Sequence, residues 1–255
     1  MIRLLLLAMF WGWGAVGTTQ DLSDYTLRAA QDALASSDPT RASLVLDSLD
    51  RQDGLSPDGY LALGNAYYET GQYGRAILAY ERGLRLRPAN ADLSNNLAYV
   101  REEAGLTEPG IPDFFLLRWW QQLGALLGST TAYVLALVFW WMAVGGALWW
   151  YLRRQRMSEQ RRFALLPAAV VGLLLALACY ALGQSRETYL AQTDQAVLVA
   201  SVADLRVSPT QEASVEDTLL EGVRLRITDR VGDYVKVVLM DGRQGYLRTT
   251  EIEII

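Results

Sequence analysis

Two long uncharged stretches constrain this chain more than any other feature. Residues 132–152 and 163–183 each contain 21 residues without a charged side chain. About 20 apolar residues in a helix cross the roughly 30 Å hydrocarbon core of a bilayer, so each stretch predicts a transmembrane helix. A pair of buried helices in a soluble protein is the alternative, and the uncharged length of both stretches argues against it. We therefore expect a multidomain membrane protein.

The residues between the two stretches indicate their orientation. The sequence RRQRMSEQRR, residues 153–162, has five arginines and one glutamate, and Trp149, Trp150 and Tyr151 precede it. Short arginine-rich loops stay in the cytoplasm, and aromatic residues gather at the membrane interface. The pattern predicts a transmembrane hairpin whose loop, residues 153–162, is cytoplasmic and whose two flanking regions lie outside.

The first residues support the same topology. Arg3 precedes about 13 mostly apolar residues, and Ala15, Val16 and Gly17 supply small residues at the expected cleavage site. This pattern is typical of a signal peptide, here residues 1–17, and an uncleaved anchor is the alternative. Both place residue 18 onward outside the cytoplasm. The predicted location is the bacterial inner membrane, with the N-terminal and C-terminal domains in the periplasm.

Residues 113–128 form a further apolar segment before the first span. Arg118, Gln121, Gln122 and Ala125 follow helical spacing and make a narrow polar stripe on an otherwise apolar helix. Such a helix suits the interface plane of a membrane. The alternatives are that it extends the span or packs on another subunit.

Composition excludes several function classes. The formal net charge is -5, histidine is absent, and Cys179 is the only cysteine. The usual zinc sites, Ser-His-Asp chemistry and Cys-His chemistry are therefore excluded, and neither soluble region has the basic surface of a nucleic-acid binder. We expect no cofactor and no enzyme activity, although catalysis by carboxylates alone stays open.

Residues 57–90 carry small and bulky residues at fixed spacing. Pro57 starts the unit, and seven later positions match a tetratricopeptide repeat: Tyr60, Leu63, Gly64, Tyr67, Ala76, Tyr80 and Pro88. The segment resembles that repeat. A degenerate repeat at about 23–56 and a terminal helix at 91–104 continue the period. An all-α solenoid is thus predicted over residues 18–110.

The resemblance also suggests where a partner would bind. Asn65 and Asn96 stand where related repeats use asparagines to bind an extended peptide, and Tyr68 and Tyr99 are expected near the same groove. The lysines that clamp a peptide carboxylate have no counterpart, since Leu61 stands at one of those positions. The alternative is that these asparagines are solvated or form local hydrogen bonds.

The C-terminal region, residues 190–255, changes to strand periodicity. Val223, Leu225 and Ile227 alternate with arginines, Asp241-Gly242 indicates a hairpin turn, and about five strands suggest a small all-β barrel. The run resembles a bacterial SH3 domain through residues 205–207, Pro209 and residues 241–246. Tyr234 and Tyr246 are its candidate ligand-binding residues, with packing in the core or at the rim as the alternative.

The order of these parts resembles that of BatE-type proteins, named after Bacteroides aerotolerance operons. The resemblance implies partners with von Willebrand A domains and a MoxR-type ATPase, in an envelope or stress assembly. It favours a non-enzymatic membrane scaffold that binds protein or peptide partners. A cell-wall tether or sensor, with the SH3-like domain on peptidoglycan, is the alternative.

Overall fold

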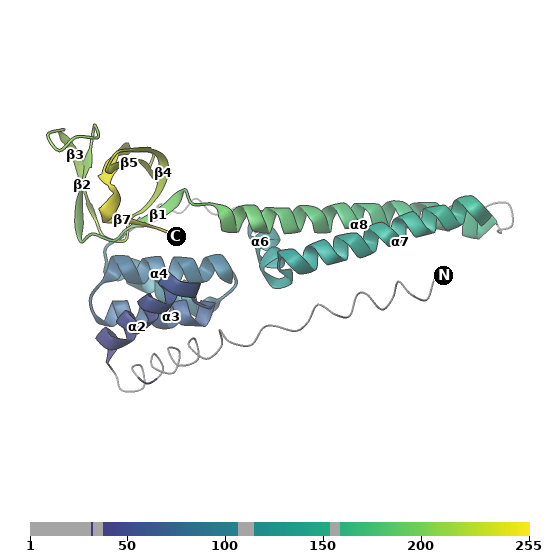
Figure 1. Ribbon diagram of the computed structural model, residues 1–255, viewed down its shortest axis with the longest axis horizontal. Coiled ribbons are helices and arrows are strands. Elements are labelled where there is room, and N and C mark those ends of the chain that lie inside the picture. Colours follow the sequence, from purple (N-terminus) through teal and green to yellow (C-terminus); the bar gives the residue numbers. More distant parts are fainter. Residues whose placement is uncertain (1–31, 33–37, 107–114, 154–158) are drawn as a thin grey trace.

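The computed structural model describes residues 32, 38–106, 115–153 and 159–255. The expected signal peptide, the start of the degenerate repeat and the centre of the arginine loop lie outside the described residues. A helical hairpin extends from a head in which helices and a sheet lie together (Figure 1).

Four helices form one half of the head. They are α2 (Pro39–Asp53), α3 (Pro57–Glu69), α4 (Tyr73–Leu86) and α5 (Ala91–Glu103). Local chemistry fixes their ends: the Ser56 hydroxyl accepts from the Gly59 amide at 3.1 Å, and the Asn90 side chain caps α5. Gly71 turns the chain between α3 and α4 at a φ of 74°, a left-handed conformation that favours glycine.

Small residues let these helices pack closely. A Cβ atom on Gly64 would overlap the Tyr80 ring, and one on Gly83 would lie 2.8 Å from Leu93. Tyr80 and Leu93 are in turn fully buried. The spacing of glycine and tyrosine in the sequence therefore reflects helix contact, as the repeat pattern predicts.

The other half of the head is one antiparallel sheet in the order β3-β2-β6-β5-β4-β1-β7. The seven strands are β1 (Gln195–Leu198), β2 (Val202–Arg206), β3 (Val215–Leu220), β4 (Arg224–Val231), β5 (Tyr234–Leu239), β6 (Gln244–Arg248) and β7 (Ile252–Ile254). The Asp241-Gly242 turn joins β5 and β6 as expected. The sequence pattern predicts about five strands and a barrel, whereas the sheet has seven strands and is not closed.

Strand β1 joins the two halves of the head. Ala196 and Leu198 belong to the core of the sheet, while Val197 between them belongs to the core of the helices. Because successive strand residues point to opposite faces, both faces of β1 are buried. The helices and the sheet therefore share a continuous interior.

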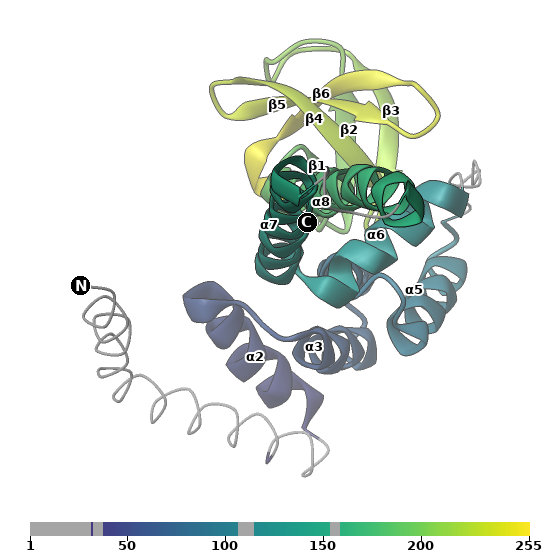
Figure 2. The same cartoon turned by 90° about the vertical axis from the view of Figure 1, so that its right-hand side faces the viewer.

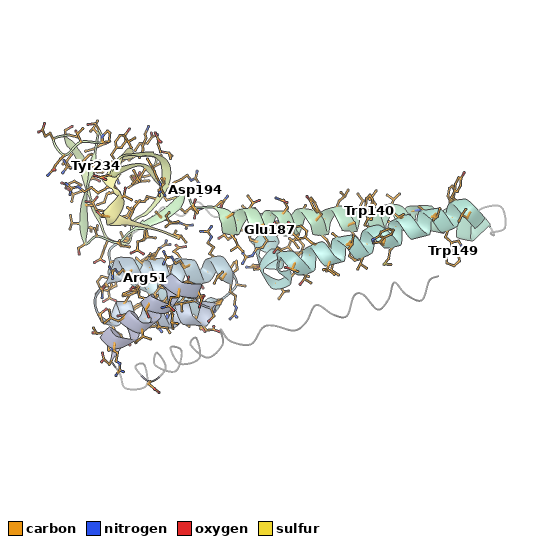
Figure 3. The ribbon with its side chains drawn as sticks, viewed as in Figure 1. Arg51, Trp140, Trp149, Glu187, Asp194 and Tyr234 are labelled. Carbon is orange, nitrogen blue, oxygen red and sulfur yellow. The ribbon has the colours of Figure 1, made fainter. Side chains whose placement is uncertain are left out.

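Three helices form the hairpin: α6 (Phe115–Leu127), α7 (Ser129–Arg153) and α8 (Glu159–Ala191). Both α7 and α8 are long and apolar enough to cross a membrane. Trp140 and Trp149, labelled along the hairpin in Figure 3, are both exposed. Helix α8 does not end with the apolar stretch at Gly183 but continues to Ala191 and reaches the head.

Helix α6 turns back against α8. Gly128, with a φ of 72°, separates α6 from α7. Gly124 is buried, and a Cβ atom there would contact Leu182 and Arg186 of α8. Figure 2 shows α6 beside α8 when viewed along the hairpin. Trp119 and Leu126 are exposed on the opposite side of α6.

Candidate interaction surface of the helical repeats

The two predicted asparagines meet on α3 and α5. Asn65 Oδ1 accepts hydrogen bonds from the Asn96 side-chain amide at 2.9 Å and from the Tyr80 hydroxyl at 2.7 Å. Two donors of the chain itself therefore occupy the Asn65 oxygen. This agrees with the alternative that the asparagines bond locally. Asn65 positions the two helices and the Tyr80 ring, and its remaining amide hydrogens are the groups that could meet a partner.

The two predicted tyrosines also lie together. The Tyr68 and Tyr99 rings meet edge to face with centroids 5.7 Å apart. The Tyr68 hydroxyl donates to Glu103 Oε2 at 2.7 Å, and the Tyr99 hydroxyl lies 3.5 Å away. Hydrogen bonds to Tyr99 and Glu103 raise the pKa of the Tyr68 hydroxyl above its ordinary value.

Exposed and charged side chains surround this pair. Tyr99 is 58 % exposed, and Glu69, Glu102 and Glu103 are exposed on the same two helices. Arg101, also on α5, instead turns to Glu81 of α4 at 2.7 Å. We call the Tyr68, Tyr99, Glu102 and Glu103 side chains the α3/α5 face. It offers aromatic rings and negative charge.

The other side of α4 is covered by the chain's own C-terminal half. Glu221, beside the turn from β3 to β4, accepts the Gly74 amide at 2.7 Å at the start of α4. Arg186 of α8 donates to the Arg85 and Leu86 carbonyls at 3.0 and 2.9 Å at its end. A carboxylate at the N-terminus and a guanidinium at the C-terminus both oppose the charges of the helix dipole.

Arg85 completes this arrangement in the reverse direction. Its guanidinium donates to the Tyr189 and Leu190 carbonyls at 2.8 and 3.1 Å, in the last turn of α8. Helices α4 and α8 thus each supply an arginine to the carboxyl end of the other. The Tyr189 ring lies 5.7 Å from the Arg85 guanidinium and 5.8 Å from that of Arg186. We call Arg85, Arg186 and Tyr189 the arginine exchange.

A buried ion pair and strand β7 extend the junction. Glu81 is 8 % exposed, pairs with Arg101 at 2.7 Å and has Arg224 of β4 at 3.7 Å. Arg82 donates to the Ile254 carbonyl at 2.7 Å and to Asp50 at 2.9 Å. The junction therefore holds the sheet, the helices and α8 in one arrangement.

The candidate residues of the sheet lie elsewhere. Tyr234 and Tyr246 alternate with the buried residues Val235 and Leu247, so both point to the outer face of the sheet. Lys236 pairs directly with Tyr246, which makes the two tyrosines diagonal neighbours on β5 and β6. Figure 3 places Tyr234 on the side of the sheet away from helices α2–α4.

Sequence comparison agrees with the helical part of the head. A family model described as TPR repeat matches residues 56–105. The chain contains a TPR repeat. The matched segment includes α3, α4 and α5, and with them the four predicted residues of the repeats. No curated protein and no solved structure matches the chain.

Sequence reasoning missed the residues of the junction. Arg85 and Glu221 stand next to helix or strand ends, where charged residues are common, and Arg186 follows the second apolar stretch. A lone arginine just after a span was the one available signal, since such residues occupy the interface. Across the described ranges, side chains that could form a metal site do not cluster.

Proposed function

We propose that this protein is a membrane-anchored scaffold that binds a protein segment on the α3/α5 face of its TPR repeat. TPR repeats have protein-interaction roles, and this face is where two helices expose aromatic and acidic side chains together. One observation carries the proposal: the opposite side of α4 is covered by the sheet and α8, which leaves the α3/α5 face open.

The chemistry of the face indicates the kind of partner. Tyr68 and Tyr99 supply flat apolar area at small entropic cost, and Glu102 and Glu103 supply negative charge. Electrostatic complementarity favours an extended segment with lysine or arginine beside aliphatic residues. In the aerotolerance-type assembly proposed here, that segment belongs to a membrane protein with a von Willebrand A domain, working with a MoxR-type ATPase.

Site-specific crosslinking in native membranes tests this proposal. A photoreactive amino acid at position 99 should capture one defined membrane protein, and the same group at position 44 should not. Leu44 is a matched control, because it is 68 % exposed on α2. Charge reversal with Glu103→Lys should abolish capture at position 99. A synthetic peptide from the captured segment should then bind the full chain and fail to bind the Glu103→Lys variant.

Membrane anchoring has its own test. Reporter fusions after positions 110 and 255 should be active outside the cytoplasm, and a fusion after position 157 should be active inside. The physical reason is that the arginine-rich loop stays on the cytoplasmic side. Cytoplasmic activity at position 255 would exclude the hairpin topology and leave the peptide-binding proposal to stand alone.

The outer face of the sheet supports a second candidate function. Tyr234 and Tyr246 lie beside Lys236 on a face that the helices do not cover. Aromatic and cationic side chains together suit an anionic wall polymer, so this face is the candidate peptidoglycan site. Sedimentation of the full chain in detergent with purified peptidoglycan tests it. The chain should pellet, a Tyr234→Ala/Tyr246→Ala variant should not, and equal pelleting would reject the site.

A further inference from the structure

A cavity lies where helix α8 leaves the apolar span and reaches the head. Its volume is about 690 Å³, and residues of α6, α8 and the start of β1 line it. This volume falls within the range of roughly 300–1,000 Å³ that is typical of sites for small ligands. Neither the TPR repeat nor the outer face of the sheet uses it.

The lining changes character along α8. Ala181 and Leu182 line the cavity at the end of the apolar stretch, and Leu117, Trp120 and Gln121 line it from α6. Gln184, Ser185 and Thr188 line it further along α8. The side of the cavity formed by α8 therefore changes from apolar to polar, and the change occurs where the chain is expected to leave the hydrocarbon core.

Arg186 supplies a buried positive charge at this level. It follows Gly183 by three residues, which is about 4.5 Å along a helix. Arg186 is 8 % exposed and lines the cavity. Its guanidinium donates to the Arg85 and Leu86 carbonyls. Among the described residues, Arg186 forms no ion pair with a carboxylate, although a guanidinium has five N–H donors.

Further arginines lie near Arg186, so the positive charge of this region exceeds its negative charge. Arg85 and Arg224 line an adjoining small cavity with Glu81 and Ile255, and Glu81 pairs with Arg101. The charged side chains that act on Tyr189 are Glu81 and three arginines, Arg85, Arg186 and Arg224. A buried guanidinium without a carboxylate partner is stabilised strongly by an anion, especially a phosphate.

We propose that this cavity binds one anionic phospholipid of the surrounding bilayer, with its phosphate at Arg186 and an acyl chain along Leu117, Ala181 and Leu182. The inference rests on the membrane anchoring proposed above. The position just beyond the span, the apolar-to-polar lining and the excess positive charge all match such a lipid. The lipid would fill the space between α6, α8 and the head and so support the angle at which the head leaves the membrane.

Native mass spectrometry of the full chain in detergent tests the proposal. Phosphatidylglycerol should remain bound as one equivalent, and phosphatidylethanolamine should be retained at least about tenfold less, because its amine neutralises its phosphate. Soluble glycerol phosphate should not bind, since it lacks the acyl chain. Equal retention of the two lipids, or equally tight binding of glycerol phosphate, would overturn the proposal.

Variants separate the cavity from the junction. Arg186→Gln should lower phosphatidylglycerol retention by about tenfold, and Arg186→Lys should restore part of it. Because Arg186 also hydrogen-bonds to the end of α4, a second variant leaves Arg186 unchanged. Ala181→Phe fills the cavity beside Leu182 and should also lower phosphatidylglycerol retention by about tenfold. Ala178→Phe is the matched control, since Ala178 is exposed on α8 and does not line the cavity. Unchanged retention in Ala181→Phe would reject the site.

Failure of this proposal is distinguishable from failure of membrane anchoring. Alkaline carbonate extraction reports anchoring directly, and the Ala181→Phe chain should stay in the membrane pellet. A chain that remains in the pellet but binds no lipid selectively would exclude only the lipid site. A chain released by carbonate would reject both proposals.

Discussion

Gly222 offers the sharpest test that the helices and the sheet form one packed head. It lies in the turn before β4 with a φ of 86°, and its amide donates to the Leu198 carbonyl at 2.7 Å. A Cβ atom there would lie 2.5 Å from Ile77 Cδ1 and 2.7 Å from Leu106 Cδ1. Both of these atoms belong to the helical side of the junction. The substitution Gly222→Ala therefore perturbs the sheet and the repeat at the same point.

The magnitude follows from two separate costs. A left-handed backbone conformation costs an alanine about 1 kcal/mol. Overpacking against Ile77, which is fully buried, adds about 1–3 kcal/mol. Gly232→Ala is the matched control, because Gly232 also has a positive φ, 61°, but a Cβ atom there would meet nothing within 4 Å. The two variants should therefore differ by about 1–3 kcal/mol.

Hydrogen exchange of the full chain in detergent measures this difference. The amides of α4 should exchange about 5- to 150-fold faster in Gly222→Ala than in Gly232→Ala, which is that free-energy difference expressed as a ratio of rates. Both variants should leave the exchange of α7 unchanged. Equal α4 rates in the two variants, with faster exchange confined to the sheet, would refute the shared interior through β1 and Gly222.

Three further predictions concern the head. Burial raises the pKa of three tyrosine hydroxyls to about 12: Tyr60, Tyr67 and Tyr80. The unfolded chain loses these protons near pH 10, so the contribution of these groups to the free energy of unfolding is complete below pH 10. It falls as the pH rises from 10 to 12. Tyrosinate absorbance and circular dichroism should therefore change together in an alkaline titration. Arg85→Ala should speed proteolysis of the linker after α8 several-fold, whereas Arg87→Ala, which removes only an exposed ion pair, should not. Asn65→Ala should lower the free energy of unfolding of the head by about 1–3 kcal/mol in urea titrations, and Asn95→Ala should leave it unchanged, because only Asn65 accepts from a buried hydroxyl.

The sequence predicted those parts of the structure that local patterns encode. The TPR helices follow from small and bulky residues at fixed spacing, and the hairpin helices follow from uncharged length. The β5–β6 turn follows from Asp241-Gly242, whose glycine adopts a φ of 90°. Each of these signals lies within a few dozen residues, so it does not depend on how distant elements meet.

The outward direction of the two sheet tyrosines was available in the sequence. Tyr234 and Lys236 are two residues apart in a strand and must share a face, so a core position for Tyr234 would have buried a lysine. A core position was therefore unfavourable for Tyr234. Their binding role stays a prediction.

The junction could not be predicted, because its partners are about 100 residues apart. Arg85 and Arg186 each looked like an ordinary arginine near a helix end. The run at β1 was apolar, but an apolar run does not tell whether a strand is buried on one face or on two. The second face of β1 becomes visible only when Val197 is seen in the core of the helices.

The arginine exchange joins the head directly to helix α8 of the hairpin. A helix carboxyl end carries about half a negative charge, and two such ends brought together would repel each other. Arg85 and Arg186 each carry a full positive charge into the opposite end, and the Tyr189 ring lies near both guanidiniums. The two arginines therefore offset the repulsion between the two carboxyl ends. Because α8 reaches the head as one continuous helix, the α3/α5 face is connected to the apolar hairpin through α4 and this exchange. If the protein is the membrane-anchored scaffold proposed above, this connection would present the partner at a set distance and angle from the membrane, which a flexible linker would not do.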